Sequence, residues 1–174
     1  MLIIRAIHPP DKSSRTICSM RSPSLTIRPA SFADAPRLHE LHTISVRTLC
    51  GGHYAPEVID GWLSERTPRG YLAPIGRGDL FVVEDGGRIV GFGEAVPGQI
   101  IAVYVDPAAT HRGVGATIMD RALVMARNGH AGPIRLESTL NAETFYQCFG
   151  FHVVARSAVQ RNQTAIPAVI MELD

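Results

Sequence analysis

The feature that most constrains the fold is an uninterrupted apolar run, Ile100–Val105, which stops at Pro107 and leads into a glycine-containing segment. A strand that is apolar at every position is expected where both faces of a sheet are covered. After Gly113, hydrophobic residues recur at spacings of three and four as far as Arg127, which predicts an amphipathic helix. A buried strand, a glycine loop and a long helix therefore follow one another, and this order favours a domain with helices packed on a sheet.

Further strands and helices are predicted on both sides of this unit. Apolar stretches separated by Gly and Pro turns predict the strands, and helical spacing predicts two helices after the first strand, divided at Gly51-Gly52. The segment Thr67–Arg77 contains Pro and Gly and is expected to be a loop. The predicted order is β-α-α-β-β-β-α-β-α-β-β, a mixed α/β sheet rather than a doubly wound one. The predicted strands cover residues 25–28, 80–84, 88–95, 100–105, 134–138, 151–159 and 165–173.

The composition argues against several classes of protein. Seventeen Lys and Arg residues against sixteen Asp and Glu leave a net charge of +1, which argues against nucleic acid or an anionic membrane as a partner. No stretch approaches the roughly 20 apolar residues that span a bilayer, and the apolar opening before Pro9-Pro10 is too short for a signal peptide. Three cysteines without a CxxC spacing predict reduced thiols, so we expect a cytoplasmic protein.

The length of 174 residues fits one domain. Residues 1–24 contain paired prolines and serines and are expected to form a poorly ordered arm. Residues 25–174 are expected to form the domain itself. Within it, Ser31 precedes Asp34 by three positions, which predicts a helix start of the capping-box kind with Asp in place of Glu.

The start of the helix after Ile100–Val105 has the properties of an anion site. Unpaired N–H groups and the helix dipole favour negative charge there. Gly113 and Gly115 remove Cβ atoms where a phosphate would approach, and Arg112 would add a guanidinium at the rim. The same pattern also fits a tight turn with close helix–sheet packing. A P-loop is excluded because no Gly-Lys-Ser/Thr follows, and a Rossmann fingerprint requires a third glycine where Ile118 stands.

Two motifs in this order resemble the GNAT (GCN5-related) N-acetyltransferase superfamily. The first is the strand and loop Val103–Gly115, and the second is Ala142–Phe151, which is similar to the family segment Ala-x-x-Phe-Tyr-x-x-x-Gly-Phe. Residues 27–34 resemble the family's first strand and helix, and residues 53–62 resemble the bacterial YafP-like branch. The resemblance implies a central, mixed, mostly antiparallel sheet flanked by helices. It also implies that acetyl-CoA donates its acetyl group to a primary amine by direct attack through a tetrahedral intermediate.

The resemblance further implies roles for individual residues. Tyr146 occupies the position of a general acid that protonates the CoA thiolate, and a phenol pKa of about 10 keeps it protonated. A core aromatic is the alternative for Tyr146. Thr110 and Thr139 depart from the family pattern, and Asn141 is expected either to hold the cofactor or to cap its helix. The resemblance implies that the cofactor contacts backbone groups of the strand and of the following turn: Val103, Tyr104, Val105, His111, Arg112, Gly113, Val114, Gly115 and Ala116.

The general base and the acceptor are left open. Glu94, Glu137 and His53 are candidate bases, and each is equally compatible with a solvated or paired side chain. A carboxylate serves as the base only if its pKa is raised. Tyr54 and Trp62 either shape an acceptor pocket or pack the helices. Near-neutral charge favours a small-molecule amine as acceptor.

Three further possibilities bear on function. His39 and His42 lie three residues apart, but no acidic or cysteine partner is spaced to complete a metal site, so no metal is expected. Cys148 is expected to be a small buried thiol rather than a nucleophile. An edge strand near the C-terminus is compatible with a homodimer. The alternative function is a non-catalytic, acetyl-CoA-binding regulatory or interaction module.

Overall fold

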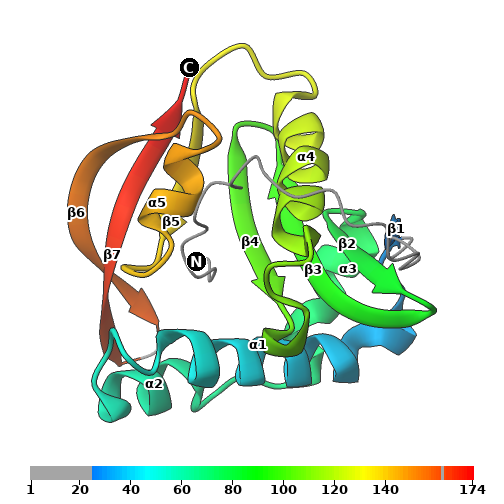
Figure 1. The fold of residues 1–174 in the computed structure, drawn as a ribbon, viewed down its shortest axis with the longest axis horizontal. Helices are drawn as coiled ribbons and strands as arrows, with labels where there is room; N and C mark the ends of the chain where they lie inside the picture. Colours follow the sequence, from blue (N-terminus) through cyan, green and yellow to red (C-terminus); the bar gives the residue numbers. More distant parts are fainter. Residues whose placement is uncertain (1–24, 162) are drawn as a thin grey trace, which may run out of the picture.

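A seven-stranded sheet in the order β1-β2-β3-β4-β5-β7-β6 organises the molecule (Figure 1). The computed structural model describes residues 25–161 and 163–174, so the predicted arm of residues 1–24 lies outside the described part. Neighbouring strands are antiparallel except β4 and β5, which are parallel. The strands are β1 (Leu25–Pro29), β2 (Leu80–Asp85), β3 (Arg88–Val96), β4 (Gln99–Val105), β5 (Ile134–Ser138), β6 (His152–Arg161) and β7 (Thr164–Leu173).

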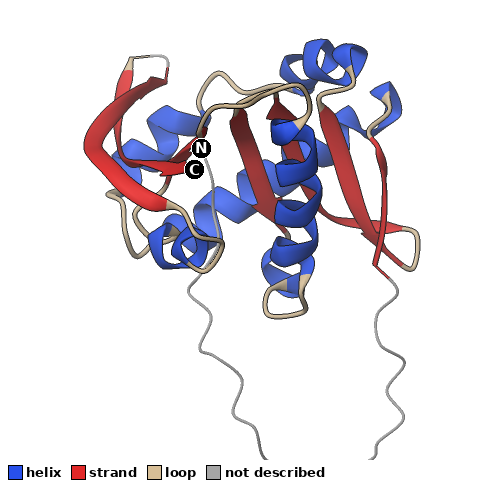
Figure 2. Ribbon diagram, turned by 90° about the horizontal axis from the view of Figure 1, so that it is seen from above, coloured by secondary structure: helices blue, strands red, loops and turns tan. Residues whose placement is uncertain are grey.

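Helices pack against the sheet (Figures 1 and 2). Their buried side chains form two hydrophobic cores, and strands of the sheet contribute residues to both. Successive side chains of β4 point to opposite faces of the sheet. Val103 and Val105 therefore belong to the core with α4 and α5, whereas Ala102 and Tyr104 belong to the core with α1, α2 and α3. No helix in the described part is both long and apolar enough to cross a membrane. The helices are α1 (Ala35–Cys50), α2 (Pro56–Leu63), α3 (Leu72–Arg77), α4 (Val114–Arg127) and α5 (Glu143–Gln147), with short 3-10 turns η1 (Phe32–Asp34), η2 (Pro68–Tyr71) and η3 (Pro107–Ala109).

The predicted fold class is confirmed, and each predicted strand is present within a few residues of its expected ends. The prediction of a loop at Thr67–Arg77 is wrong, because this segment forms η2 and α3. Pro68 and Pro74 lie in the first turns of these elements, where a missing N–H costs no internal hydrogen bond. Gly78, with φ of 79°, then ends α3. The prolines and the glycine therefore delimit two short helices.

The parallel pair β4 and β5 is short. The two strands pair through Gln99↔Arg135 and Ile100↔Leu136 and then diverge (Figure 1). A parallel connection needs a crossover element, and α4 provides it. The C-terminal half of β4 therefore borders the position where the sheet opens, next to the start of α4.

Two glycines of β3 allow α4 to lie close to the sheet. A Cβ at Gly91 would come within 2.8 Å of Ile118 and Val114, and a Cβ at Gly93 would come within 2.7 Å of Ile118. Side-chain carbons do not pack that closely, so β3 has no space for a side chain under α4. This contact fixes the position of the α4 N-terminus relative to the end of β4.

The side chain of Asp34 joins the start of η1 to β1 through hydrogen bonds. Its carboxylate accepts hydrogen bonds from the backbone N–H of Ser31 at 2.7 Å and from Arg28 at 2.7 Å. These bonds lower the pKa of Asp34 to about 2, chiefly through Arg28. The carboxylate half of the predicted capping box is therefore present.

We expect Asp34→Asn to lower the free energy of unfolding at neutral pH. Because Arg28 is 38% exposed, solvent screening limits the loss to about 1 kcal/mol. The lowered pKa means that the stabilisation is present above the unfolded-state value near 4 and is lost as pH falls toward 2. Urea unfolding across this range should therefore show a smaller acid dependence in the variant. Asp60→Asn, which removes an exposed pair with Arg47, is the control, and an equal loss there would contradict the assignment.

Candidate active site

The turn between β4 and α4 ends in a helix start whose first N–H groups have no side-chain cap among the described residues. Helix α4 begins at Val114, and Gly113 before it has φ of 81°, in the left-handed region that favours glycine. Within the described residues no side chain caps this end, and no atom lies within 4 Å of a Cβ placed on Gly113. Hydrogen bonding within the helix starts at the N–H of Thr117. The amides of residues 114–116 therefore precede the first helical hydrogen bond, as the donors of an anion site do.

Asp106 and Thr110 hold this turn in shape. The Asp106 carboxylate accepts from the backbone N–H of Ala108 at 3.0 Å and from Arg37 of α1 at 2.8 Å. The Thr110 hydroxyl donates to the carbonyl of Pro107 at 2.9 Å. Thr110, which departs from the family pattern, thus supplies an internal loop contact of its own. The part played by Asp106 was missed by sequence reasoning, although an Asp before Pro at a turn start is a recognisable signal.

The other predicted turn residues lie at the surface. His111 has φ of 61°, which is unusual for a residue with a side chain. The guanidinium of Arg112 pairs with Asp85 of β2 and is therefore already neutralised in the free protein. His53 and His111 line one cavity of about 400 Å³ between the end of α1 and this turn. The candidate base His53 thus lies beside the turn that precedes α4.

Tyr146 lies on α5, in the hydrophobic core that residues of α4 and α5 form together. The residue is 0% exposed and packs against Phe145 and Phe151 with ring centroids 5.0 and 6.1 Å away. Its hydroxyl has no hydrogen-bond partner among the residues described. Burial raises the pKa of Tyr146 well above its ordinary value, so the phenol stays protonated. A buried hydroxyl without a protein partner is uncommon, because such groups are nearly always paired with protein or with ordered water.

Asn141 does not cap α5, so that prediction is wrong. The helix is preceded by Ala142, which makes no side-chain cap. The Asn141 amide instead donates to the carbonyl of Leu49 at 3.1 Å and accepts from the Cys50 thiol at 3.5 Å. It therefore ties the segment after β5 to the end of α1. A cofactor contact from Asn141 stays a prediction.

A row of aromatic side chains connects α1 with β4. The His42 ring stacks on Tyr104 with centroids 4.0 Å apart, and its Nδ1 lies 3.0 Å from the Tyr71 hydroxyl. Burial lowers the pKa of His42 well below its ordinary value, so the ring is neutral at pH 7. His39 makes a different contact: its Nε2 lies 3.0 Å from the carbonyl oxygen of Arg66. Among the described residues no group of three His, Cys, Asp or Glu could hold a metal ion.

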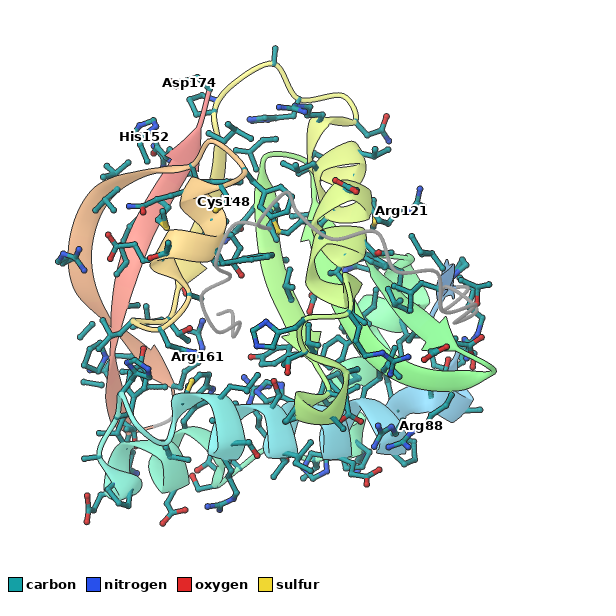
Figure 3. All side chains as sticks on the ribbon, viewed as in Figure 1. Arg88, Arg121, Cys148, His152, Arg161 and Asp174 are labelled. Atoms are coloured by element: carbon teal, nitrogen blue, oxygen red, sulfur yellow. The ribbon has the colours of Figure 1, made fainter. Side chains whose placement is uncertain are left out.

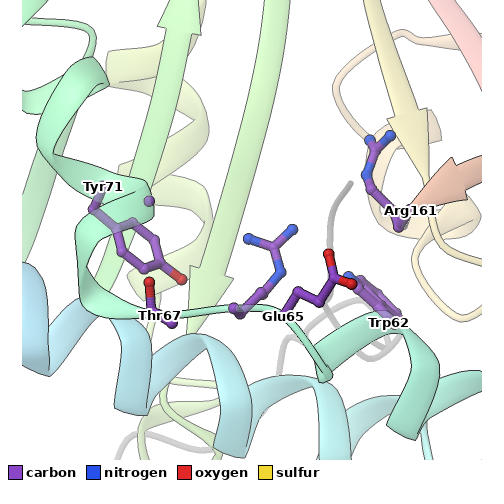
Figure 4. A pocket seen from close by; sticks show the side chains of 7 residues that line it. Trp62, Glu65, Thr67, Tyr71 and Arg161 are labelled. Carbon is purple, nitrogen blue, oxygen red and sulfur yellow. The ribbon is translucent and has the colours of Figure 1, made fainter. Parts of the chain in front are cut away.

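A second cavity lies on the α1 face of the sheet. It has a volume of about 250 Å³ and is bounded by the end of α2, the segment that follows it, η2 and the end of β6 (Figure 4). Figure 3 shows Arg161 at the end of β6, on the side of α1 and α2. Trp62 is 1% exposed and lines this cavity, so it packs the helices, and a role in shaping an acceptor pocket stays a prediction. The other lining residues are Glu65, Arg66, Thr67, Gly70, Tyr71 and Arg161.

Tyr54 has a structural role rather than one in this cavity. Its hydroxyl donates to the carbonyl of Pro167 at 2.9 Å and accepts from the backbone N–H of Leu140 at 2.9 Å. These bonds join the α1–α2 turn to β7 and to the segment after β5. The expectation that Cys148 is buried is wrong, because Cys148 follows the last turn of α5 and is exposed. The buried thiol is Cys50, whose pKa burial raises to about 12.

The two candidate carboxylates differ in their partners. Glu94 lies at a bulge of β3, on the face of Phe92, whose ring is 6.0 Å from that of Tyr71. Burial raises the pKa of Glu94, and none of the ion pairs between described residues includes it. Glu137 of β5 accepts from Arg161 at 2.9 Å. Glu94 is therefore the carboxyl group with the environment of a base.

Comparison with known proteins identifies similar sequences and structures. The chain is 22% identical over 137 residues to the Escherichia coli (strain K12) protein named "Uncharacterized N-acetyltransferase YafP", which covers 79% of this chain and 87% of that protein. A GCN5-related N-acetyltransferase structure from Rhodopseudomonas palustris superimposes with a TM-score of 0.79 at 24% identity, over 90% of this chain and 98% of that one. The PaiA N-acetyltransferase of Thermoplasma acidophilum, solved with coenzyme A, gives a TM-score of 0.69 at 24% identity, over 86% and 98%.

The fold and the site together define the class of enzyme as an acetyl-CoA-dependent N-acetyltransferase. The family model of the acetyltransferase (GNAT) domain matches residues 52–174, which is more than half of the sequence. The chain therefore belongs to this family, and the membership predicted from its two motifs is confirmed.

Proposed function

We propose that the protein transfers the acetyl group of acetyl-CoA to a primary amine of a small molecule, with Tyr146 as general acid. The observation that carries this proposal is the Tyr146 hydroxyl, which is buried and has no hydrogen-bond partner within the described part of the chain. A protonated donor without a partner suits a leaving thiolate, because the thiolate needs a proton as the C–S bond breaks. A tyrosine with a structural role pairs its buried hydroxyl, as Tyr54 does with Pro167 and Leu140.

The residues at the opening of the sheet fit acetyl-CoA. The amides of Val114, Gly115 and Ala116 would hold the pyrophosphate, since they lack helical partners and the helix dipole favours an anion. Arg112 would reach the phosphates if it shared its guanidinium with Asp85. The backbone of Val103–Val105, where β4 has diverged from β5, would hold the pantetheine arm.

Glu94 acts as the general base in this proposal. The acceptor amine attacks the thioester carbon, a C–N bond forms, and the C–S bond breaks. Glu94 takes one proton from the amine nitrogen through a water molecule, and Tyr146 gives its proton to the sulfur. The raised pKa of Glu94 makes it a stronger base than an ordinary carboxylate, whereas Glu137 is already paired with Arg161.

A CoA-release assay tests the proposed function. We expect turnover with at least one member of a panel of amines, amino acids, aminoglycosides and peptide N-termini. Mass spectrometry of the product should show one added acetyl group on nitrogen. Binding of acetyl-CoA without turnover of any amine would instead support a non-catalytic binding module, the alternative function.

A further inference from the structure

We propose that the acceptor amine carries a carboxylate, and that Arg66 and Trp62 bind this carboxylate in the cavity of about 250 Å³. An amino acid is the simplest molecule of this chemical class. The inference rests on the proposed function, because it assigns the anchoring group of the amine that is acetylated.

Two buried donors of this cavity have no acceptor. The Nε of Arg66 and the Nε1 of Trp62 are buried, and neither has a hydrogen-bond partner in the part of the chain that the structure describes. Both groups can donate but not accept. Buried polar atoms are nearly always paired, so this cavity calls for a ligand that brings acceptors. A carboxylate has two acceptor oxygens and no donor.

The charges around the cavity favour a single negative charge. Arg161 is paired with Glu137 at 2.9 Å, which neutralises it. Arg66 belongs to none of the ion pairs formed between residues of the described ranges. The side chain of Glu65 also lines the cavity, and Glu65 is exposed. Arg66 hydrogen bonds to Tyr71, and its charge is not neutralised by an ion pair within the described ranges. One such guanidinium next to an acidic side chain suits a monoanion better than a phosphate dianion.

The cavity is connected by direct contacts to the strand at the reaction centre. Tyr71, in its wall, hydrogen bonds to His42, and His42 stacks on Tyr104 of β4. Tyr104 is close enough to Tyr146 to contribute to the raised pKa of that phenol. Glu94 likewise acts on the pKa of Tyr71, although burial is the main cause of its rise to about 12. An amine anchored through its carboxylate would therefore lie next to both the proposed base and β4.

The test compares common L-amino acids with their decarboxylated amines as acceptors. The wild-type protein should have the higher kcat/KM for the amino acid of at least one pair. Arg66→Met should lower kcat/KM for that amino acid by about 10- to 100-fold and change that for its amine by less than about threefold. Trp62→Phe, which keeps an aromatic ring but removes the donor, should change the ratio in the same direction. Arg69→Met removes an exposed guanidinium of the same segment and should leave both values unchanged.

Other outcomes would overturn the inference or separate it from the proposed function. Carboxylate binding would be overturned if Arg66→Met lowered kcat/KM equally for an amino acid and its decarboxylated amine. It would also be overturned if the wild type preferred the amine in every pair. Acetyl transfer would stand in both cases. If no amine is acetylated, the proposed function fails. In that case, calorimetric titration of the CoA-loaded protein with the amino acids tests the carboxylate site separately. Binding heat that is present in the wild type and lost in Arg66→Met supports the site, and equal heats in the two proteins overturn it.

Discussion

Tyr146→Phe should lower kcat by about 10²- to 10⁴-fold, the contribution expected of a general acid. The phenyl ring keeps its contacts with Phe145 and Phe151, so the core is preserved. Removing a hydroxyl that has no partner in the described structure should leave thermal stability unchanged or slightly higher. The measurement is steady-state kinetics of CoA release with a saturating acceptor, together with acetyl-CoA binding by calorimetry.

Tyr54→Phe is the matched control for this change. Its hydroxyl makes two hydrogen bonds, to Pro167 and Leu140, so its loss should cost about 1–3 kcal/mol of stability. It should change kcat far less than Tyr146→Phe does. If Tyr146→Phe retains full kcat, the general acid is another group and Tyr146 is a core aromatic.

Glu94→Gln should also reduce kcat by about 10²- to 10⁴-fold, because a general base is lost. The pH profile gives a second readout. Glu94 is active when deprotonated, so wild-type kcat/KM should rise with pH through a pKa above the ordinary carboxyl value. The groups that act on this carboxyl include Arg77, Asp79 and Arg66, and burial is the dominant cause of the raised pKa. In Glu94→Gln this acidic limb of the profile should disappear.

Glu137→Gln tests which of the two carboxylates, Glu94 or Glu137, is the general base. It frees the guanidinium of Arg161, which lines the proposed acceptor cavity, so it should strengthen binding of a carboxylate-bearing acceptor, while the acidic limb of the pH profile remains. Loss of that limb in Glu137→Gln but not in Glu94→Gln would assign the base to Glu137. Glu94→Asp, which keeps a carboxyl group, should recover part of the activity that Glu94→Gln loses.

The sequence by itself determined the elements that depend on local patterns. The apolar run of β4 and the periodicity of α4 depend on residues close in the chain, so strand and helix could be predicted from them. The turn between β2 and β3 is also local, because Gly86 and Gly87 adopt the positive φ that a tight hairpin turn requires. The loop predicted at Thr67–Arg77 failed because Pro and Gly mark the ends of short helices as well as loops.

Only the tertiary structure decided which side chains are paired and which are left without partners. Arg37 reaches Asp106 across 69 positions, and Asn141 reaches Leu49 across 92. Tertiary packing pairs Glu137 with Arg161 and raises the pKa of Glu94 by burial, and it leaves the Tyr146 hydroxyl and the Arg66 Nε without hydrogen-bond partners among the described residues. Pairing and desolvation depend on contacts between distant segments, and a linear pattern does not contain them. The apolar run and the glycine turn thus predicted the strand, turn and helix of the proposed cofactor site, and the packing of α1, α2 and η2 against the sheet formed the proposed acceptor cavity.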